Sequence, residues 1–149
     1  MDDPGALLPA RAATLAAVGE GAIRVLLCDD APGFRALIRY TLEDDPDLVI
    51  VGEAADGEAG LRAVGELCPD VVLLDLSMPG LQGLDAIAAM LERSPASRVV
   101  ALSGFTAEEM ADRARACGAH AYVEKGTGTN AIRDAIRTAA AGTAPGPSA

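Results

Sequence analysis

The stretch Val71-Val72-Leu73-Leu74-Asp75-Leu76-Ser77-Met78-Pro79-Gly80 places four branched apolar residues directly before a carboxylate. An unbroken apolar run of this length is typical of a strand that is buried on both faces. The chain then turns through Met-Pro-Gly. Asp75 is therefore either an ordinary polar residue at a strand end or a carboxylate that the strand holds at a chosen point.

Five short apolar runs of this kind occur along the chain, at residues 23–28, 48–54, 71–76, 98–104 and 119–125. The segments between them have helical spacing, as in the stripe formed by Phe34, Leu37, Ile38 and Thr41. Strands that alternate with helices predict βαβ units. We therefore expect a doubly wound (βα)5 α/β fold, in which helices cover both faces of a five-stranded parallel sheet.

The two ends of the chain differ from the repeating part. Residues 1–22 are rich in Ala, Gly and Pro, and we expect an N-terminal extension that is flexible or forms a short helix around residues 10–18. Residues 142–149 read as a flexible tail. One domain at residues 23–141 remains.

Composition excludes several classes of function. The net charge is −10 and the arginines form no patch, which argues against direct nucleic-acid binding. Cys28, Cys68 and Cys117 are widely separated and odd in number, so we expect small core residues in a reducing cytoplasm rather than disulfides or a metal site. There is no apolar run long enough for a membrane span and no secretory signal, so a cytoplasmic protein is expected.

Polar residues follow four of the five apolar runs. The carboxyl ends of parallel strands meet at one edge of a sheet, where ligands bind in folds of this class. The second run, which ends at Glu53 and Ala54, adds nothing clear. The other runs bring to that edge three carboxylates, one hydroxyl and the only lysine of the chain: Asp29, Asp30, Asp75, Ser103 and Lys125.

Each of these residues also has an ordinary structural explanation. Asp30 could cap the first helix, because it precedes Ala-Pro, and Asp29 could be a solvated strand end. Asp75 could form an Asx turn, Ser103 could cap the fourth helix, and Lys125 could neutralise any of the acids. These explanations account for the residues singly but not for their gathering at one edge.

Together the residues predict phosphoryl chemistry. Three carboxylates and one lysine leave surplus negative charge, which a hard divalent cation, Mg²⁺, would neutralise. A carboxylate beside the metal can attack phosphorus and form an acyl phosphate. Lys125 would neutralise the phosphoryl oxygens and Ser103 would donate a hydrogen bond to one of them.

At these positions the sequence resembles the receiver domain of two-component response regulators, over residues 23–141. The motifs that carry the resemblance are VLLCDD, LLDLSMPGLQGLDAI, ALSG and AYVEKG. The resemblance implies the flavodoxin-like (CheY-like) fold with strand order 2-1-3-4-5. It implies that Asp75 is the phosphoacceptor and that Mg²⁺ is bound by Asp29, Asp30, Asp75 and the backbone carbonyl of Ser77, with Lys125 as the family's lysine and with Ser103 and Tyr122 as switch residues.

The resemblance also implies partners. A sensor histidine kinase or a phosphotransfer protein would donate the phosphoryl group, and the face of the fourth helix, fifth strand and fifth helix would bind a second copy or a downstream protein. The expected chemistry is limited to this transfer and autodephosphorylation, so the chain would be a signalling domain and not an enzyme. Gly126 stands where many receivers have a cis proline, a form similar to receivers that carry helix-turn-helix domains.

Four alternatives share parts of this pattern. A flavodoxin-type nucleotide binder needs a first loop that attracts phosphate, and Asp-Asp-Ala-Pro repels anions. A dehalogenase-type phosphatase would have a second aspartate where Ser77 stands. A hydrolase based on histidine is disfavoured, because His120 is expected at a surface turn. A pseudo-receiver that binds proteins without phosphorylation remains the principal alternative.

Overall fold

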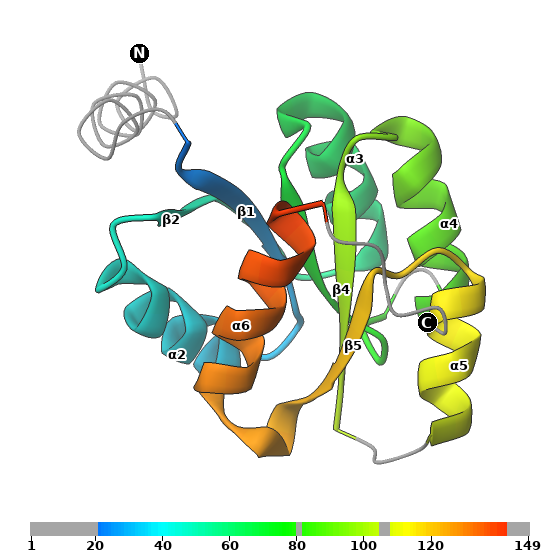
Figure 1. Ribbon diagram of the computed structural model, residues 1–149. Helices are drawn as coiled ribbons and strands as arrows, with labels where there is room; N and C mark the ends of the chain where they lie inside the picture. Colours follow the sequence, from blue (N-terminus) through cyan, green and yellow to red (C-terminus); the bar gives the residue numbers. More distant parts are fainter. Residues whose placement is uncertain (1–20, 80–81, 105–107, 143–149) are drawn as a thin grey trace.

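The computed structural model describes residues 21–79, 82–104 and 108–142, and it confirms the predicted α/β fold (Figure 1). Within these residues the strands are β1 (Ile23–Cys28), β2 (Leu48–Ala54), β3 (Val71–Asp75), β4 (Arg98–Ser103) and β5 (Ala121–Glu124). The helices are α2 (Pro32–Glu43), α3 (Gly57–Leu67), α4 (Gly83–Arg93), α5 (Glu108–Ala116) and α6 (Thr129–Ala140), with a 3-10 turn, η1, at Lys125–Thr127. The predicted helix at 10–18, Gly80 and residues 143–149 lie outside the described residues.

The five strands form one parallel sheet in the order β2-β1-β3-β4-β5, as the resemblance predicts. The central strand β3 is buried at all five positions. It is buried throughout because helices cover both faces of the sheet, which explains why its sequence is a continuous apolar run.

Two apolar clusters lie on opposite faces of the sheet (Figure 1). On one face α2 and α6 pack on the sheet through residues such as Ile38 and Ile136, both of which are fully buried. On the other face α3, α4 and α5 contribute Val64, Ile87 and Ala114. Side chains alternate along each strand, so each strand supplies both clusters and becomes the rigid middle layer of the domain.

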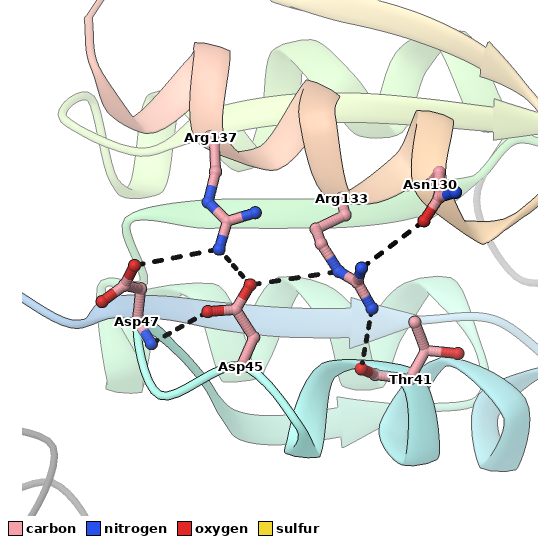
Figure 2. Close-up of polar contacts among 6 residues, drawn as sticks. All are labelled: Thr41, Asp45, Asp47, Asn130, Arg133 and Arg137. Carbon is pink, nitrogen blue, oxygen red and sulfur yellow. Dashed lines mark hydrogen bonds and ion pairs between the residues drawn. The ribbon is translucent and has the colours of Figure 1, made fainter.

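An arginine network joins α6 to the turn between α2 and β2 (Figure 2). Arg137 binds the carboxylate of Asp45 and lies 3.8 Å from that of Asp47. The Arg133 Nε atom lies 3.9 Å from the Asp45 carboxylate, and its Nη2 donates to the Thr41 carbonyl at 3.1 Å. The acidic turn between α2 and β2 therefore ties two helices of one layer together.

Three residues differ from their sequence-based expectation. Leu37 belongs to the predicted apolar stripe of the first helix but is 48% exposed, because only one side of α2 meets the sheet. Cys68 is exposed and not a core residue, since it caps the C-terminal end of α3 in the left-handed conformation (φ 45°). His120 is only 9% exposed and not at a surface turn, because its N–H donates to the Val99 carbonyl and draws it against β4.

Replacing Gly83 with alanine should destabilise the domain by about 1–3 kcal/mol, the usual cost of overpacking. A Cβ atom at Gly83, the first residue of α4, would lie 2.3 Å from the Leu76 carbonyl oxygen. Because this oxygen belongs to the backbone, no side-chain rotation can relieve the clash. Gly65 is the matched control, because it is an exposed helical residue whose Cβ would meet nothing within 4 Å. Gly65→Ala should stabilise by roughly 0.5–1 kcal/mol. Urea unfolding curves that show the same loss for both variants would contradict the assignment.

Candidate functional site

Three carboxylates meet at the carboxyl edge of the sheet. Asp29 and Asp30 follow β1, Asp75 ends β3, and the register pairs Cys28 with Leu74 on these neighbouring strands. One carboxylate oxygen from each aspartate lies within 4.8 Å of the other two. Asp29 and Asp75 are 0% and 1% exposed, whereas Asp30 is exposed. The cluster is therefore open to solvent on the side of Asp30.

The backbone and side chain of Asp29 are held from three directions. Its N–H donates to the Ala54 carbonyl of β2 at 3.0 Å, and its Oδ1 accepts a hydrogen bond from the Ala31 N–H at 2.8 Å. Its carbonyl accepts a hydrogen bond from Arg35 Nη1 at 2.6 Å. Arg35 Nε in turn binds the Glu53 carboxylate at 3.1 Å. The end of β2, which gave no signal in the sequence, thus supports the end of β1.

The simple structural explanations for the acidic pair are wrong. The N-cap residue of α2 is Ala31, and no side chain caps this helix, so Asp30 is not the cap. Asp29 is buried and is not a solvated strand end. The pair instead directs one buried and one exposed carboxylate toward the same edge.

Asp75 is both an Asx-turn residue and a buried carboxylate. Its Oδ1 accepts hydrogen bonds from the Ser77 N–H at 3.0 Å and the Ser77 hydroxyl at 2.9 Å. The following residue, Leu76, still donates its N–H to the Leu102 carbonyl of β4 at 3.0 Å. Turn and sheet therefore fix Asp75 together, and its Oδ2 faces Lys125.

Lys125 is the cation of the cluster. It begins η1 directly after β5, and its Nζ lies 2.6 Å from Asp29 Oδ2 and 3.4 Å from Asp75 Oδ2. The same ammonium lies over the ring of Phe34, 4.4 Å from the ring centroid. Lys125 therefore bridges two buried carboxylates from two different strands.

Two titratable groups of the site have shifted pKa values. Burial of Lys125 acts to lower its pKa, but the hydrogen bond with Asp29 and the charges of Asp75 and Asp29 outweigh it and raise the pKa above 10.5. Burial raises the pKa of the Cys28 thiol to about 12, and the charge of Asp29 adds to the shift. Lys125 is therefore charged at neutral pH, and Cys28 is a neutral core thiol rather than a nucleophile.

The remaining predicted residues lie near this edge. Ser103 is the last residue of β4, is 3% exposed, and is paired in register with Glu124, which precedes Lys125. Tyr122 lies in β5 and packs on the cluster under α3, α4 and α5. Switching by these two residues, and metal binding by the Ser77 carbonyl, stay predictions.

Three contributors to the site were missed from the sequence: Phe34, Arg35 and Glu53. Phe34 was read only as part of the apolar stripe of the first helix. Glu53 does end an apolar run, so the rule that located the other residues could have found it. Its charge needed a partner, and Arg35 supplies it from α2.

A family model described as "Response regulator receiver domain" matches residues 25–137 of this chain. The chain is a response regulator receiver domain. The family consists of signalling domains rather than enzymes, and the four acidic and basic residues of its marker motifs are the ones that meet here: Asp29, Asp30, Asp75 and Lys125.

Curated relatives and solved structures agree with this assignment. The receiver domain is 37% identical over 118 residues to the nitrate/nitrite response regulator protein NarL of Escherichia coli, which covers 79% of this chain and 55% of that protein. It is 37% identical over 120 residues to the transcriptional regulatory protein LiaR of Bacillus subtilis, with 80% and 57% covered. The signal receiver domain of the putative NarL from Mycobacterium tuberculosis superposes with a TM-score of 0.76 at 32% identity, covering 80% and 97%. The chain thus spans about half the length of the curated relatives it matches.

A groove of about 540 Å³ lies beside β2. Its lining includes Leu42, Leu48 and Glu53 but none of the three clustered aspartates. Many receivers have a cis proline after the family's lysine, but here Gly126 follows Lys125, and the described residues contain no cis peptide bond.

The helices of the described residues include none with the length and hydropathy of a membrane span.

Lys125→Met should lower the urea midpoint at pH 8 in Mg²⁺-free buffer, because it leaves two buried carboxylates without a cation. The folded-state pKa of Lys125 is raised, so the stability it contributes is fully present below pH 10.5 and is lost as the pH rises through the folded pKa. The difference between wild type and Lys125→Met should therefore narrow as the pH rises through that raised pKa. Lys125→Arg is the control: arginine keeps its charge at high pH, so the stability that its charge contributes should not fall over the same pH range. A difference that stays constant from pH 8 upward would contradict the ion-pair role.

Proposed function

We propose that this receiver domain accepts a phosphoryl group on Asp75 from the phosphohistidine of a sensor histidine kinase or a phosphotransfer protein. The observation that carries the proposal is that the two carboxylate oxygens of Asp75 have different partners. Oδ1 accepts two hydrogen bonds from Ser77, while Oδ2 faces the Lys125 ammonium at 3.4 Å. We assign Oδ2 as the attacking oxygen.

In the proposed step, Asp75 Oδ2 forms a bond to phosphorus while the bond between phosphorus and the donor imidazole nitrogen breaks. The imidazole leaves with the electron pair of that bond and takes a proton, and the product is an acyl phosphate on Asp75. Ser77 keeps the carboxylate in one orientation during the attack. Lys125 neutralises charge on the phosphoryl oxygens, and hydrolysis later returns the carboxylate and inorganic phosphate.

The donor set fits Mg²⁺. Three aspartates with one oxygen each inside a 4.8 Å cluster carry more negative charge than Lys125 can balance, and oxygen ligands suit a hard cation. We propose that Asp29, Asp30, Asp75 and the Ser77 carbonyl hold the ion. When bound, it supplies positive charge for the oxygens of the incoming phosphoryl group.

We propose that α5, β5 and α6 form the output face and that α5 is the part that moves. Among Met110–Ala116 only Ala114 is buried, so α5 has a shallow apolar anchor. The helix α6 buries Ile132, Ile136 and Ala139 and is tied to Asp45 by arginines (Figure 2). Movement of Ser103 toward the phosphoryl group and reorientation of Tyr122 would therefore displace α5 at a lower free-energy cost than α6. A second copy or a downstream protein would read that change.

The phosphodonor protein is proposed to dock on α2. Leu37 and Tyr40 are 48% and 72% exposed and are the exposed large apolar side chains of the described residues. They lie one and two turns along the same helix from Phe34, which contacts Lys125. A partner that covers them therefore brings its phosphohistidine close to Asp75.

Incubation with acetyl phosphate and Mg²⁺ should add the mass of one phosphoryl group to the intact protein, and Asp75→Asn should abolish the adduct. The reason is that Asp75 supplies the attacking oxygen, which an amide lacks as a nucleophile. Asp47→Asn is the matched control, since Asp47 is 73% exposed and contacts Arg137 away from the cluster. An adduct that persists in Asp75→Asn would refute the acceptor assignment, and no adduct in the wild type would favour the pseudo-receiver.

Tyr40→Ala should slow phosphotransfer from a protein donor about ten-fold or more, as for a hot-spot residue, without changing the acetyl phosphate rate. The donor is the purified, autophosphorylated histidine kinase that transfers fastest in a panel. Arg62→Ala on α3, an exposed residue of the opposite layer, is the control and should transfer normally. Equal slowing with both donors would show that Tyr40 acts on the site and not on docking.

A further inference from the structure

Phe34 contacts the site in a way that the transfer step does not require. The Lys125 Nζ lies 4.4 Å from the centroid of its ring, within the range of a cation–π contact. The lysine side chain is 22% exposed, so the ammonium is partly removed from water, and partial desolvation strengthens this attraction. Phe34 itself packs against the apolar cluster under α2 and α6, which restrains the position of its side chain.

The other two contacts of Lys125 are with carboxylates that a divalent cation would bind. Its Nζ lies against Asp29 Oδ2 and Asp75 Oδ2, which belong to the carboxylates of the cluster. A cation held by these carboxylates would neutralise part of their charge and repel the ammonium at short range. The ring of Phe34 offers no ligand atom to a hard cation, so a bound metal would not compete with Lys125 for this contact.

We propose that Phe34 is a positioning residue that keeps the Lys125 ammonium at the acidic cluster while a divalent cation is bound there. This inference rests on the proposed function, because it concerns the metal-bound state in which phosphoryl transfer takes place. In that state Lys125 can release the carboxylates and still lie beside the incoming phosphoryl oxygens, since the ring holds it from the side of α2.

The turn of α2 that carries Phe34 is itself fixed to the site. The next residue, Arg35, donates to the Asp29 carbonyl at 2.6 Å and binds Glu53 at 3.1 Å. One turn further, Ile38 is completely buried. The position of the ring is therefore coupled to Asp29, the residue that lies closest to the lysine.

The chain allows a direct measurement, because Lys125 is its only lysine. Incorporation of ¹³C-lysine gives a single set of Hε resonances, and a ring at this distance should shift them upfield. We expect the upfield shift to persist in saturating Mg²⁺, to vanish in Phe34→Leu and to remain in Phe34→Tyr, whose ring also attracts cations. Ile38→Val removes one buried methylene from the same helix and controls for a general loosening of α2.

The second measurement is the rate of phosphorylation by acetyl phosphate at saturating Mg²⁺, together with the Mg²⁺ affinity from calorimetry. Phe34→Leu should phosphorylate about two- to five-fold more slowly, the range of one partly exposed cation–π contact, while binding Mg²⁺ as tightly as wild type or more tightly. Phe34→Tyr should be phosphorylated at the wild-type rate. Ile38→Val should keep both the rate and the resonance position.

Two results would overturn the inference: a wild-type lysine resonance that Mg²⁺ moves to the position seen in Phe34→Leu, or a Phe34→Leu rate equal to that of wild type. Failure of the proposed function looks different. In that case the wild-type protein forms no phosphoryl adduct, but its lysine resonance in Mg²⁺ still reports whether the ring holds the ammonium.

Discussion

The structure depends on one electrostatic arrangement: two buried carboxylates, on neighbouring strands, that share one lysine. Asp29 and Asp75 are almost inaccessible to solvent, and burial of a charge is costly unless hydrogen bonds and an opposite charge offset it. Here the Ala31 N–H, both donors of Ser77 and the Lys125 ammonium supply that compensation. A binding module alone would have no need to bear this cost, which is why the cluster points to chemistry.

This arrangement sets requirements for the fold around it. The two aspartates adjoin only because β1 lies beside β3, and the lysine reaches them only because β5 ends at the same edge. The middle layer is rigid, since each strand is packed on both faces. The α2 and α6 layer is cross-linked by the Asp45 network, whereas among Met110–Ala116 of α5 only Ala114 is buried in the opposite cluster. The same sheet therefore carries a rigid site at its carboxyl edge and, on one face, a helix that is only lightly anchored.

Much of this could be predicted from the sequence, for identifiable reasons. Strands buried on both faces leave continuous apolar runs, and the predicted and observed bounds of β1 and β2 coincide. The strand order did not follow from periodicity, because apolar runs carry no information on which neighbour a strand pairs with, and it came from the family resemblance. The errors at Leu37 and His120 arise because the burial of each residue depends on packing against elements that are remote in sequence. The same cause concealed Phe34 and Arg35. The error at Cys68 is local, since the residue caps α3 in the left-handed conformation.

The use of a single lysine among eleven arginines has a physical explanation in these contacts. An ammonium is compact, so one nitrogen can lie 2.6 Å from one carboxylate and 3.4 Å from another while it faces an aromatic ring. A guanidinium is planar and wider, and it binds a carboxylate or a row of acceptors side by side. Arginine is found where that geometry is useful: Arg35 spans the Asp29 carbonyl and Glu53, and Arg137 lies between Asp45 and Asp47. At residue 125 three partners converge on one point, and only a point charge on a flexible stem satisfies all of them.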